Sequence, residues 1–207
     1  MVERQTTETL LERALAEIGA GRDDVSALVA LHRRPTRTVF NAAAGMLDAP
    51  QADRRQLAAR ILRELGREGT GRMPFAGLAV PLLRRRLAVE TDPGVLAWVI
   101  SALGHNDATR AMPEVAAFAR HPDAGVRLQV AASLPALVDA DSVEEVASVA
   151  LVALSTDSDA DVRYSALVAI VEELPGFDPQ QRRSAVAARL GDPDQQIKEF
   201  ALASRDT

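Results

Sequence analysis

The three histidines are the side chains best suited to chemistry, and their spacing argues against a metal centre. His32, His105 and His121 are the only histidines in the chain, and no two of them stand three or four residues apart. Helical metal ligands need that spacing, so a site would have to recruit carboxylates from distant parts of the chain. Cysteine is absent, which removes thiolate ligands, thiolate nucleophiles and disulfides. We predict no metal site and no cofactor, and histidines that are solvated or locally hydrogen-bonded.

Serines and glycines do not form a recognisable catalytic motif either. The chain contains no G-x-S-x-G turn, and Ser101, Ser133 and Ser165 fall within segments that have the pattern of helices. The glycine pairs at residues 19–21 and 69–71 lack the third glycine and the βαβ context of a dinucleotide-binding loop. The sequence therefore favours a protein that is not an enzyme.

Basic residues recur beside short acidic turns. Arg127, Arg163 and Lys198 each come one residue after the first apolar residue of a helical pattern. The neighbouring turn aspartates are Asp123, Asp159, Asp161 and Asp194. Such aspartates can cap the helices and bond to the basic side chains of adjacent turns, and their recurrence favours a structural role over ligand binding. Ala58 and Leu96 stand at the corresponding earlier positions, so we expect this ladder of ion pairs only in the C-terminal half.

Two aromatic residues are the best candidates for binding a partner. Trp98 and Tyr164 are the only Trp and Tyr, and they follow the aligned core residues Val95 and Val162 by three and two positions, which places them beside the core stripe. An aromatic ring with a polar tip on an open surface is a good binding anchor, while a partly buried packing role is the alternative. The candidate binding residues are Arg60, Trp98, Gln129 and Tyr164.

Charge favours a protein or peptide partner over nucleic acid. The formal net charge is −5, from 24 basic and 29 acidic residues, so no global excess of positive charge attracts phosphate backbones. Arginines do gather in the N-terminal half, at positions 54, 55, 60, 63, 67 and 84–86. They form either a local basic patch or a solvated helix face.

Composition points to an all-α protein. The chain has 207 residues, of which 47% are hydrophobic and only 3% aromatic, which suits closely packed helices better than sheets. The charged N-terminus does not look like a secretory signal, and no apolar run approaches the roughly 18 residues that a membrane helix needs. We expect a soluble, cytoplasmic protein without a membrane segment.

The chain divides into helix pairs. A first pair covers Thr6–Ile18 and a segment capped by Asp23 or Asp24 and ending near Arg33. Five further pairs are predicted: Thr36–Leu47 with Gln51–Leu65, Pro74–Val89 with Gly94–Leu103, Thr109–Arg120 with Gly125–Val138, Ser142–Leu154 with Ala160–Leu174, and Pro179–Leu190 with Gln195–Ser204. Residues 67–73 form a loop, and Pro81 should kink its helix. The first pair lacks the turn signature of the others, as expected of a terminal cap.

The second helices of these pairs can be aligned on one apolar position. That position is Leu57, Val95, Val126, Val162 and Ile197, with spacings of 38, 31, 36 and 35 residues. The residues four and eight further on are also apolar in most copies, which defines one buried helical face. Regular spacing of this kind predicts stacked repeats.

The repeated turns resemble those of the HEAT-repeat class, in particular the short bacterial HEAT-like repeats that also occur in phycobilisome lyase-type proteins. The matching residues lie at 122–127, 159–163 and 193–198, with Leu-Gly at 65–66 and 103–104. The resemblance implies a right-handed α-α superhelix that forms a single domain over residues 1–207, with a cap pair at 1–34 and five pairs at 35–207. It also implies a scaffold or adaptor that holds a protein partner in a concave groove.

Two other functions of similar proteins stay open at this point. One is a DNA-binding protein or an enzyme similar to the HEAT-like alkylpurine DNA glycosylases, which would require converging arginines, an acidic residue and exposed aromatics. The other is a lyase-like protein that handles a small ligand. The oligomeric state does not follow from the sequence.

Overall fold

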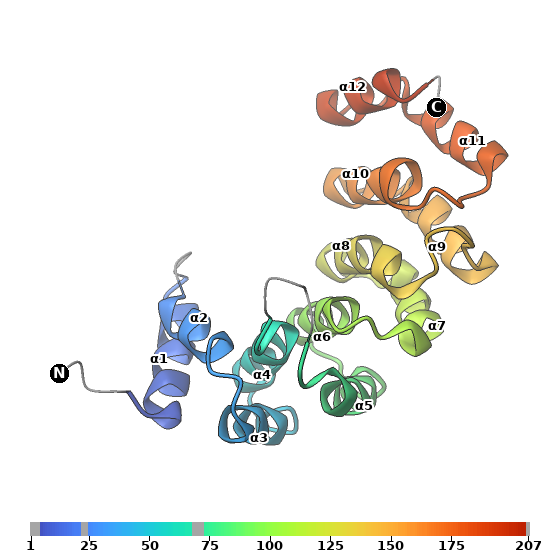
Figure 1. The fold of residues 1–207 in the computed structure, drawn as a ribbon. Helices are drawn as coiled ribbons and strands as arrows, with labels where there is room; N and C mark the ends of the chain where they lie inside the picture. The colour runs from blue at the N-terminus through green and yellow to red at the C-terminus, as the bar shows by residue number, and fades with distance from the viewer. Residues whose placement is uncertain (1–4, 22–24, 68–72, 206–207) are drawn as a thin grey trace. The chain divides into compact units, whose positions relative to one another are not determined.

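A computed structural model describes residues 5–21, 25–67 and 73–205. These residues form twelve α-helices joined by turns, with short 3-10 and π segments, and within them the only extended pairing is an isolated bridge between Asp139 and Ser142 (Figure 1). The predicted all-α architecture of successive helix pairs is confirmed. Backbone contacts divide the chain into two compact units, Met1–Asn106 and Asp107–Thr207. We call them the N-terminal unit and the C-terminal unit.

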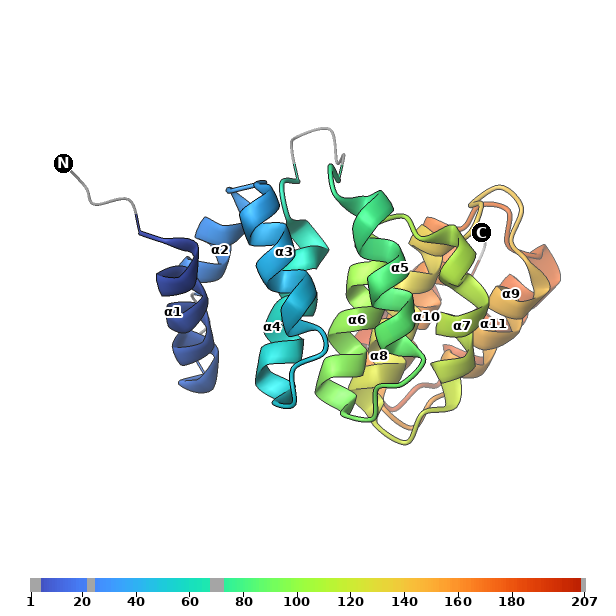
Figure 2. The same cartoon turned by 90° about the horizontal axis from the view of Figure 1, so that it is seen from below.

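Six helices build the N-terminal unit. They are α1 (Thr7–Gly19), α2 (Ser26–His32), α3 (Arg37–Met46), α4 (Ala52–Glu64), α5 (Ala76–Leu87) and α6 (Pro93–His105). Helices α1 and α2, α3 and α4, and α5 and α6 pack as successive pairs, and α4 also packs against α2 and α6 (Figures 1 and 2). The second helices of the three pairs therefore lie next to one another. The possible capping residues Asp23 and Asp24 lie outside the described residues.

The C-terminal unit has six α-helices, three of which are flanked or continued by 3-10 or π turns. They are α7 (Met112–Ala116, flanked by 3-10 turns at Thr109–Ala111 and Ala117–Arg120), α8 (Ala124–Ser133, followed by the 3-10 turn Leu134–Leu137), α9 (Glu145–Leu154), α10 (Ala160–Val168, continued by the π turn Ala169–Glu173), α11 (Pro179–Arg189) and α12 (Gln195–Ala203). The predicted helix at 125–138 ends early because Pro135 has no backbone N–H to continue the hydrogen-bond ladder.

Aspartates cap the second helices as predicted. Asp123, Asp159 and Asp194 each accept a hydrogen bond from the backbone amide three residues later, at 3.0 to 3.2 Å. Asp92 does the same for α6 at 2.9 Å. A carboxylate at this position satisfies an otherwise unpaired amide and faces the positive end of the helix.

A ladder of buried ion pairs joins neighbouring turns in the C-terminal unit. Arg127 donates through Nε and NH2 to the two carboxylate oxygens of Asp157, at 2.7 and 2.8 Å. Arg163 donates in the same way to Asp192, at 3.0 and 2.8 Å. In both cases NH1 donates to two backbone carbonyls of the turn before the arginine's own helix. Each acidic partner lies two residues before the capping aspartate of the next second helix, so one guanidinium ties two repeats together.

The prediction that this ladder is confined to the C-terminal half is wrong. Arg55 donates through Nε and NH2 to Glu90, at 2.8 and 3.0 Å, and through NH1 to the carbonyls of Ala49 and Pro50. Arg55 is the fourth residue of α4, the same place that Arg127 holds in α8. The N-terminal unit therefore contains a member of the ladder.

The error has a geometric cause. The predicted repeat alignment treats Leu57 and Val95 as equivalent positions. In the structure, Leu57 lies six residues after the N-cap of α4, whereas Val95 lies three residues after the N-cap of α6. Both side chains are fully buried. Residues three apart face nearly the same way on a helix, so burial periodicity alone cannot fix the register of a repeat.

The core consists of the aligned apolar stripes of the second helices. Val95, Val126, Val162 and Ile197 are at most 1% exposed, and so are the residues four positions later.

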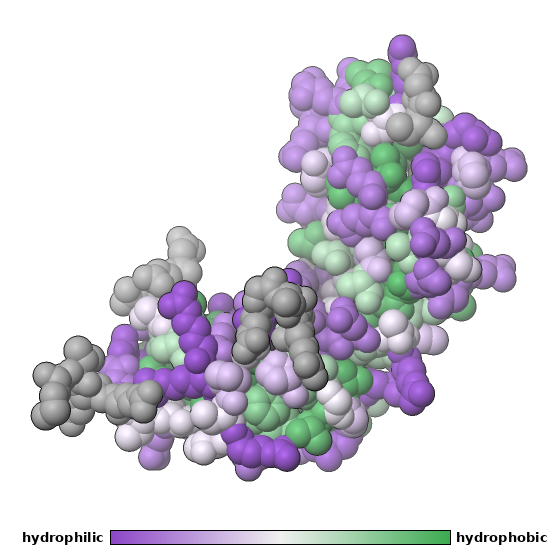
Figure 3. Space-filling model, viewed as in Figure 1, coloured by the Kyte–Doolittle hydropathy of each residue, from purple (hydrophilic) through white to green (hydrophobic). Residues whose placement is uncertain are grey.

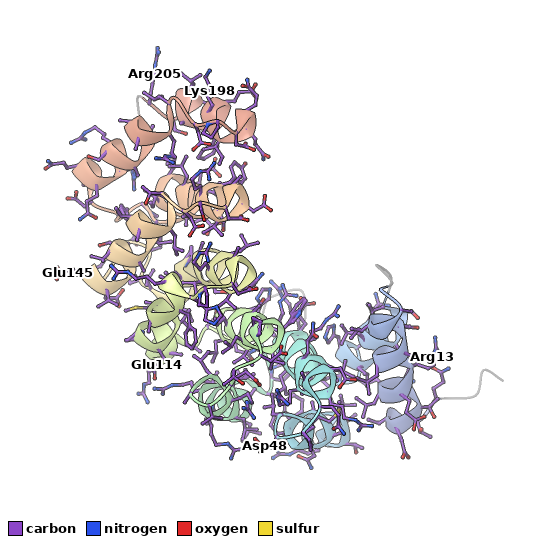
Figure 4. The ribbon with its side chains drawn as sticks, turned by 180° about the vertical axis from the view of Figure 1, so that it is seen from behind. Arg13, Asp48, Glu114, Glu145, Lys198 and Arg205 are labelled. Carbon is purple, nitrogen blue, oxygen red and sulfur yellow. The ribbon has the colours of Figure 1, made fainter. Side chains whose placement is uncertain are left out.

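The last ladder position, Lys198, is exposed on α12 (Figure 4). Hydrophilic side chains cover much of the C-terminal unit, with hydrophobic ones showing between the helices (Figure 3).

Candidate binding site on helices α4 and α6

Two of the four predicted binding residues meet in the N-terminal unit. The guanidinium carbon of Arg60, on α4, lies 4.6 Å from the centre of the Trp98 ring on α6, and that of Arg63 lies 5.9 Å from it. Arg60, Arg63 and Trp98 are all half-buried. A cation at this distance from an indole is attracted by the negative face of the ring.

Arg63 is held in a hydrogen-bond network with α6. Its Nε donates to Ser101 Oγ at 3.0 Å, and its NH2 donates to His105 Nε2 at 2.6 Å. Its NH1 forms an ion pair with the adjacent Glu64. His105 Nδ1 in turn lies 3.0 Å from the Ser101 carbonyl. This arrangement places the proton of His105 on Nδ1 and makes Nε2 an acceptor, so the imidazole is neutral.

His32 lies on the other side of α4. Its Nε2 donates to the Arg60 carbonyl at 2.9 Å, and its Nδ1 lies 3.9 Å from a carboxylate oxygen of Glu64. Burial lowers the pKa of both His32 and His105, and the positive charge of Arg63 lowers both further. His121 accepts a hydrogen bond from the Asp123 amide at 3.1 Å. All three histidines are thus hydrogen-bonded; His105 and His121 have partners close in sequence, as predicted, whereas the partner of His32 lies 28 residues away.

The electrostatics of the cluster are unbalanced toward positive charge. Burial lowers the pKa of Arg60 and of Arg63, and each is further lowered by a neighbouring guanidinium, Arg63 for the first and Arg67 for the second. Of the carboxylates in the described part of the chain, Glu64 acts on Arg63 and raises its pKa. The Nε of Arg60 is buried without a hydrogen-bond partner among the described residues. We call Arg60, Arg63, Arg67 and Trp98 the Arg/Trp cluster.

A pocket of about 430 Å³ adjoins the cluster. Its lining includes His32, Arg33, Glu64 and Arg67. Gly66 shapes its wall with a φ of 74°, and its amide donates to the His32 carbonyl at 2.9 Å. A Cβ at Gly66 would lie 2.5 Å from a side-chain atom of Pro35, so only glycine fits this turn.

The charge of the chain is also divided unevenly between its units. Residues 1–106 contain 15 basic and 12 acidic residues, a formal charge of +3. Residues 107–207 contain 9 basic and 17 acidic residues, a formal charge of −8. The Arg/Trp cluster therefore belongs to a basic unit of an acidic chain.

The other two predicted binding residues lie in the C-terminal unit. Gln129 is half-buried on α8. Tyr164, on α10, packs edge-on against Phe200 of α12 with ring centres 5.7 Å apart. This contact corresponds to the packing alternative for Tyr164, and the binding roles of both residues stay predictions.

The arginine run at 84–86 does not form an isolated basic patch. Arg85 pairs with Asp48 at 2.6 Å, in the turn between α3 and α4 (Figure 4). Arg86 lies 3.1 Å from Glu90, the same carboxylate that binds Arg55. These arginines contribute to the structure of the unit.

An apolar groove lies between α7 and α9 in the C-terminal unit. It has a volume of about 470 Å³ and is lined mainly by alanine and valine, with Val146 and Val149 each about half exposed. Arg120 and Glu145 also line it. No signal in the sequence distinguished these two outer helices from ordinary repeat helices.

Sequence reasoning missed Arg63 as a second cation beside Trp98, and Ser101 and His105 as the hydrogen-bond partners of Arg63. Ser101 and His105 follow Trp98 by three and seven residues, and Arg63 follows Arg60 by three, which is the spacing of one helical face. That periodicity could have indicated the cluster. Across the described ranges, no group of three or more metal-binding side chains occurs and no helix is long and apolar enough to cross a membrane.

Comparison with solved structures places this architecture among repeat proteins built from helix pairs. The YibA protein of E. coli matches with a TM-score of 0.72 and 16% identity, over 99% of this chain and 76% of that one. The archaeal HEAT-like repeats protein from Thermococcus onnurineus NA1 matches with a TM-score of 0.58 and 13% identity, over 97% and 79%. At these identities the similarity concerns the fold alone.

Residues 80–171 match the family model for HEAT repeats, so this part of the chain carries the HEAT-like repeats that the turns predicted. A chain of the complex of CpcE and CpcF of phycocyanin lyase from Nostoc sp. PCC7120 aligns with a TM-score of 0.47 and 19% identity, over 99% and 95%. That score is too low to support an argument about function. The comparison with curated proteins found no match.

Proposed function

We propose that the protein is a non-enzymatic interaction module that binds a protein partner through the surface of α4 and α6 in its N-terminal unit. The observation that supports this most strongly is the half-buried pair of Arg60 and Trp98, because arginine and tryptophan are the side chains most enriched in binding hot spots. Repeat folds built from stacked helix pairs suit extended contacts of this kind.

The geometry gives less support to the two alternatives. A DNA-binding function is favoured by the converging arginines with Glu64 and Trp98 nearby. It is disfavoured by the −8 charge of the C-terminal unit, since a long polyanion would be repelled there. A lyase-like function has only the shared repeat in its favour.

The proposal can be tested by affinity capture with the full chain as bait in an extract of its source cells. Wild type, Trp98→Ala and a control, Leu202→Ala, are compared by quantitative mass spectrometry. Leu202 is an apolar side chain of α12 that is 45% exposed. Proteins recovered with wild type and the control but lost with Trp98→Ala are then purified, and their affinities for the three baits are measured.

We expect at least one purified partner to bind Trp98→Ala about tenfold or more weakly than wild type, the usual size of a hot-spot loss. Equal recovery with all three baits, or no partner at all, would remove the α4–α6 surface from the account.

A further inference from the structure

We propose that the Arg/Trp cluster recognises an acidic segment of its protein partner, with a side-chain carboxylate bound to Arg60 beside the ring of Trp98. This inference rests on the proposed function and specifies the chemistry of the partner.

The first support is the excess of cations at the site. Arg60 and Arg63 approach the same indole at 4.6 and 5.9 Å. Glu64 pairs with Arg63, and no ion pair of Arg60 occurs among the described residues. The charge of Arg63 also acts against that of Arg60, so an anion bound to Arg60 is attracted by both cations and gains more than it would at a single arginine.

The second support is the contrast between Arg60 and the ladder arginines. Arg55, five residues earlier on α4, donates four hydrogen bonds: its Nε and NH2 bind Glu90 and its NH1 binds two backbone carbonyls. Arg60 is instead stacked on Trp98, with a buried Nε that has no partner within the described ranges. The ring fixes the guanidinium in place without using its hydrogen-bonding capacity, which leaves NH1 and NH2 for a ligand.

The third support concerns the type of anion. The ladder arginines of this chain bind carboxylates through two parallel hydrogen bonds. An aspartate or glutamate of a partner presents the same group, and the apolar part of the segment can cover the exposed part of Trp98. Nucleic acid is the less suitable ligand, because it needs a long basic track, whereas this cluster comprises three arginines from α4 and the turn that follows it.

The single tryptophan provides a direct assay. Trp98 is the only Trp in the chain, so intrinsic fluorescence excited in its absorption band reports on this site alone. The full-length protein is titrated with an acetylated and amidated hexaglutamate peptide at low salt. Three further ligands are titrated in parallel: hexaglutamine, inorganic phosphate and a single-stranded oligonucleotide.

The matched variants are Arg60→Gln and Arg54→Gln. Both remove one positive charge from α4, but Arg54 is exposed and lies six residues away, about 9 Å along the helix axis. Circular dichroism of each variant shows whether it is folded. Neither arginine belongs to the ion-pair ladder, so both variants should fold, and Arg60→Gln should lose only the stability that its contact with Trp98 contributes.

We expect hexaglutamate to change the fluorescence of wild type saturably, and Arg60→Gln to weaken binding about tenfold or more, with Arg54→Gln within about twofold of wild type. Raising the salt concentration from about 50 to 500 mM should weaken binding, while hexaglutamine should not bind. Equal binding by both variants, or binding of phosphate or the oligonucleotide but not of hexaglutamate, would overturn the proposal.

The failure of this inference is distinguishable from that of the proposed function. If the captured partner depends on Trp98 but binds wild type and Arg60→Gln equally at both salt concentrations, the interaction surface stands and the acidic recognition is wrong. If no Trp98-dependent partner exists, the proposed function itself fails.

Discussion

Replacing Arg163 by methionine should strongly destabilise the C-terminal unit. Methionine keeps much of the length of the side chain but removes its charge and all its donors. The change deletes two hydrogen bonds to Asp192 and two to backbone carbonyls at the start of α10. The side chain of Asp192 is fully buried, so its carboxylate cannot turn to water instead.

The expected loss in free energy of unfolding follows from the buried Asp192 charge that the substitution leaves without its main partner. Removing one partner of a buried ion pair costs about 3–5 kcal/mol, because the other charge remains buried. Asp192 still accepts from Arg189 at 3.2 Å and from the Asp194 amide at 3.0 Å, which places the expected loss near the lower end, at about 3 kcal/mol. For a chain of this size that is a fall in melting temperature of at least about 6 °C.

The assay is thermal and urea unfolding followed by far-ultraviolet circular dichroism. Arg183→Met, at an exposed arginine of α11, is the control and should stay within about 0.5 kcal/mol of wild type. The double variant Arg163→Met with Asp192→Leu removes both charges of the pair and should recover part of the loss, limited by Arg189 and the Asp194 amide, which then lose their acceptor. An Arg163→Met protein as stable as wild type would refute the view that the ladder holds the repeats together.

Three further outcomes are expected. Arg55→Met should lower the free energy of unfolding by about 3 kcal/mol, since it leaves the buried Glu90 carboxylate with fewer partners. A loss below about 1 kcal/mol by urea titration would contradict the stabilising role of the Arg55–Glu90 pair. Val130→Asp should cost at least about 4 kcal/mol, because Val130 is completely buried and an aspartate there has no partner; an unchanged melt would show that the core face is wrong. The lowered pKa of His32 and His105 means that the unfolded chain binds more protons, so stability should fall as the pH drops below about 6.5; a double His→Asn variant should flatten this dependence between pH 7 and 5.5, and an unchanged slope would contradict it.

The sequence allowed the helices and their pairing to be predicted because the signals are local. Capping aspartates such as Asp123 and breakers such as Pro35 act within a few residues of where they stand. Apolar periodicity then identified the buried face of each helix. The same periodicity could not set the register of α4, where Leu57 and Ala58 are both buried, and this concealed the role of Arg55.

The candidate site was only partly predictable because it depends on contacts between helices. The offset of Trp98 from the core stripe indicated a surface position, and Arg60 could be placed on the neighbouring second helix. The bonds from Arg63 to Ser101 and His105 join residues 38 and 42 positions apart, and no local pattern encodes that register. The partners of the ladder arginines were missed for the same reason, since Asp157 and Asp192 lie two residues before the caps and have no local signature.

Binding of an acidic partner at the Arg/Trp cluster would place a carboxylate of the partner on Arg60. A crystal structure of the full chain with the hexaglutamate peptide tests it most directly. We predict a peptide carboxylate within hydrogen-bond distance of the Arg60 guanidinium, next to the ring of Trp98. A peptide seated elsewhere, for example in the groove between α7 and α9, with Arg60 still stacked on Trp98 and unbound, would contradict the account.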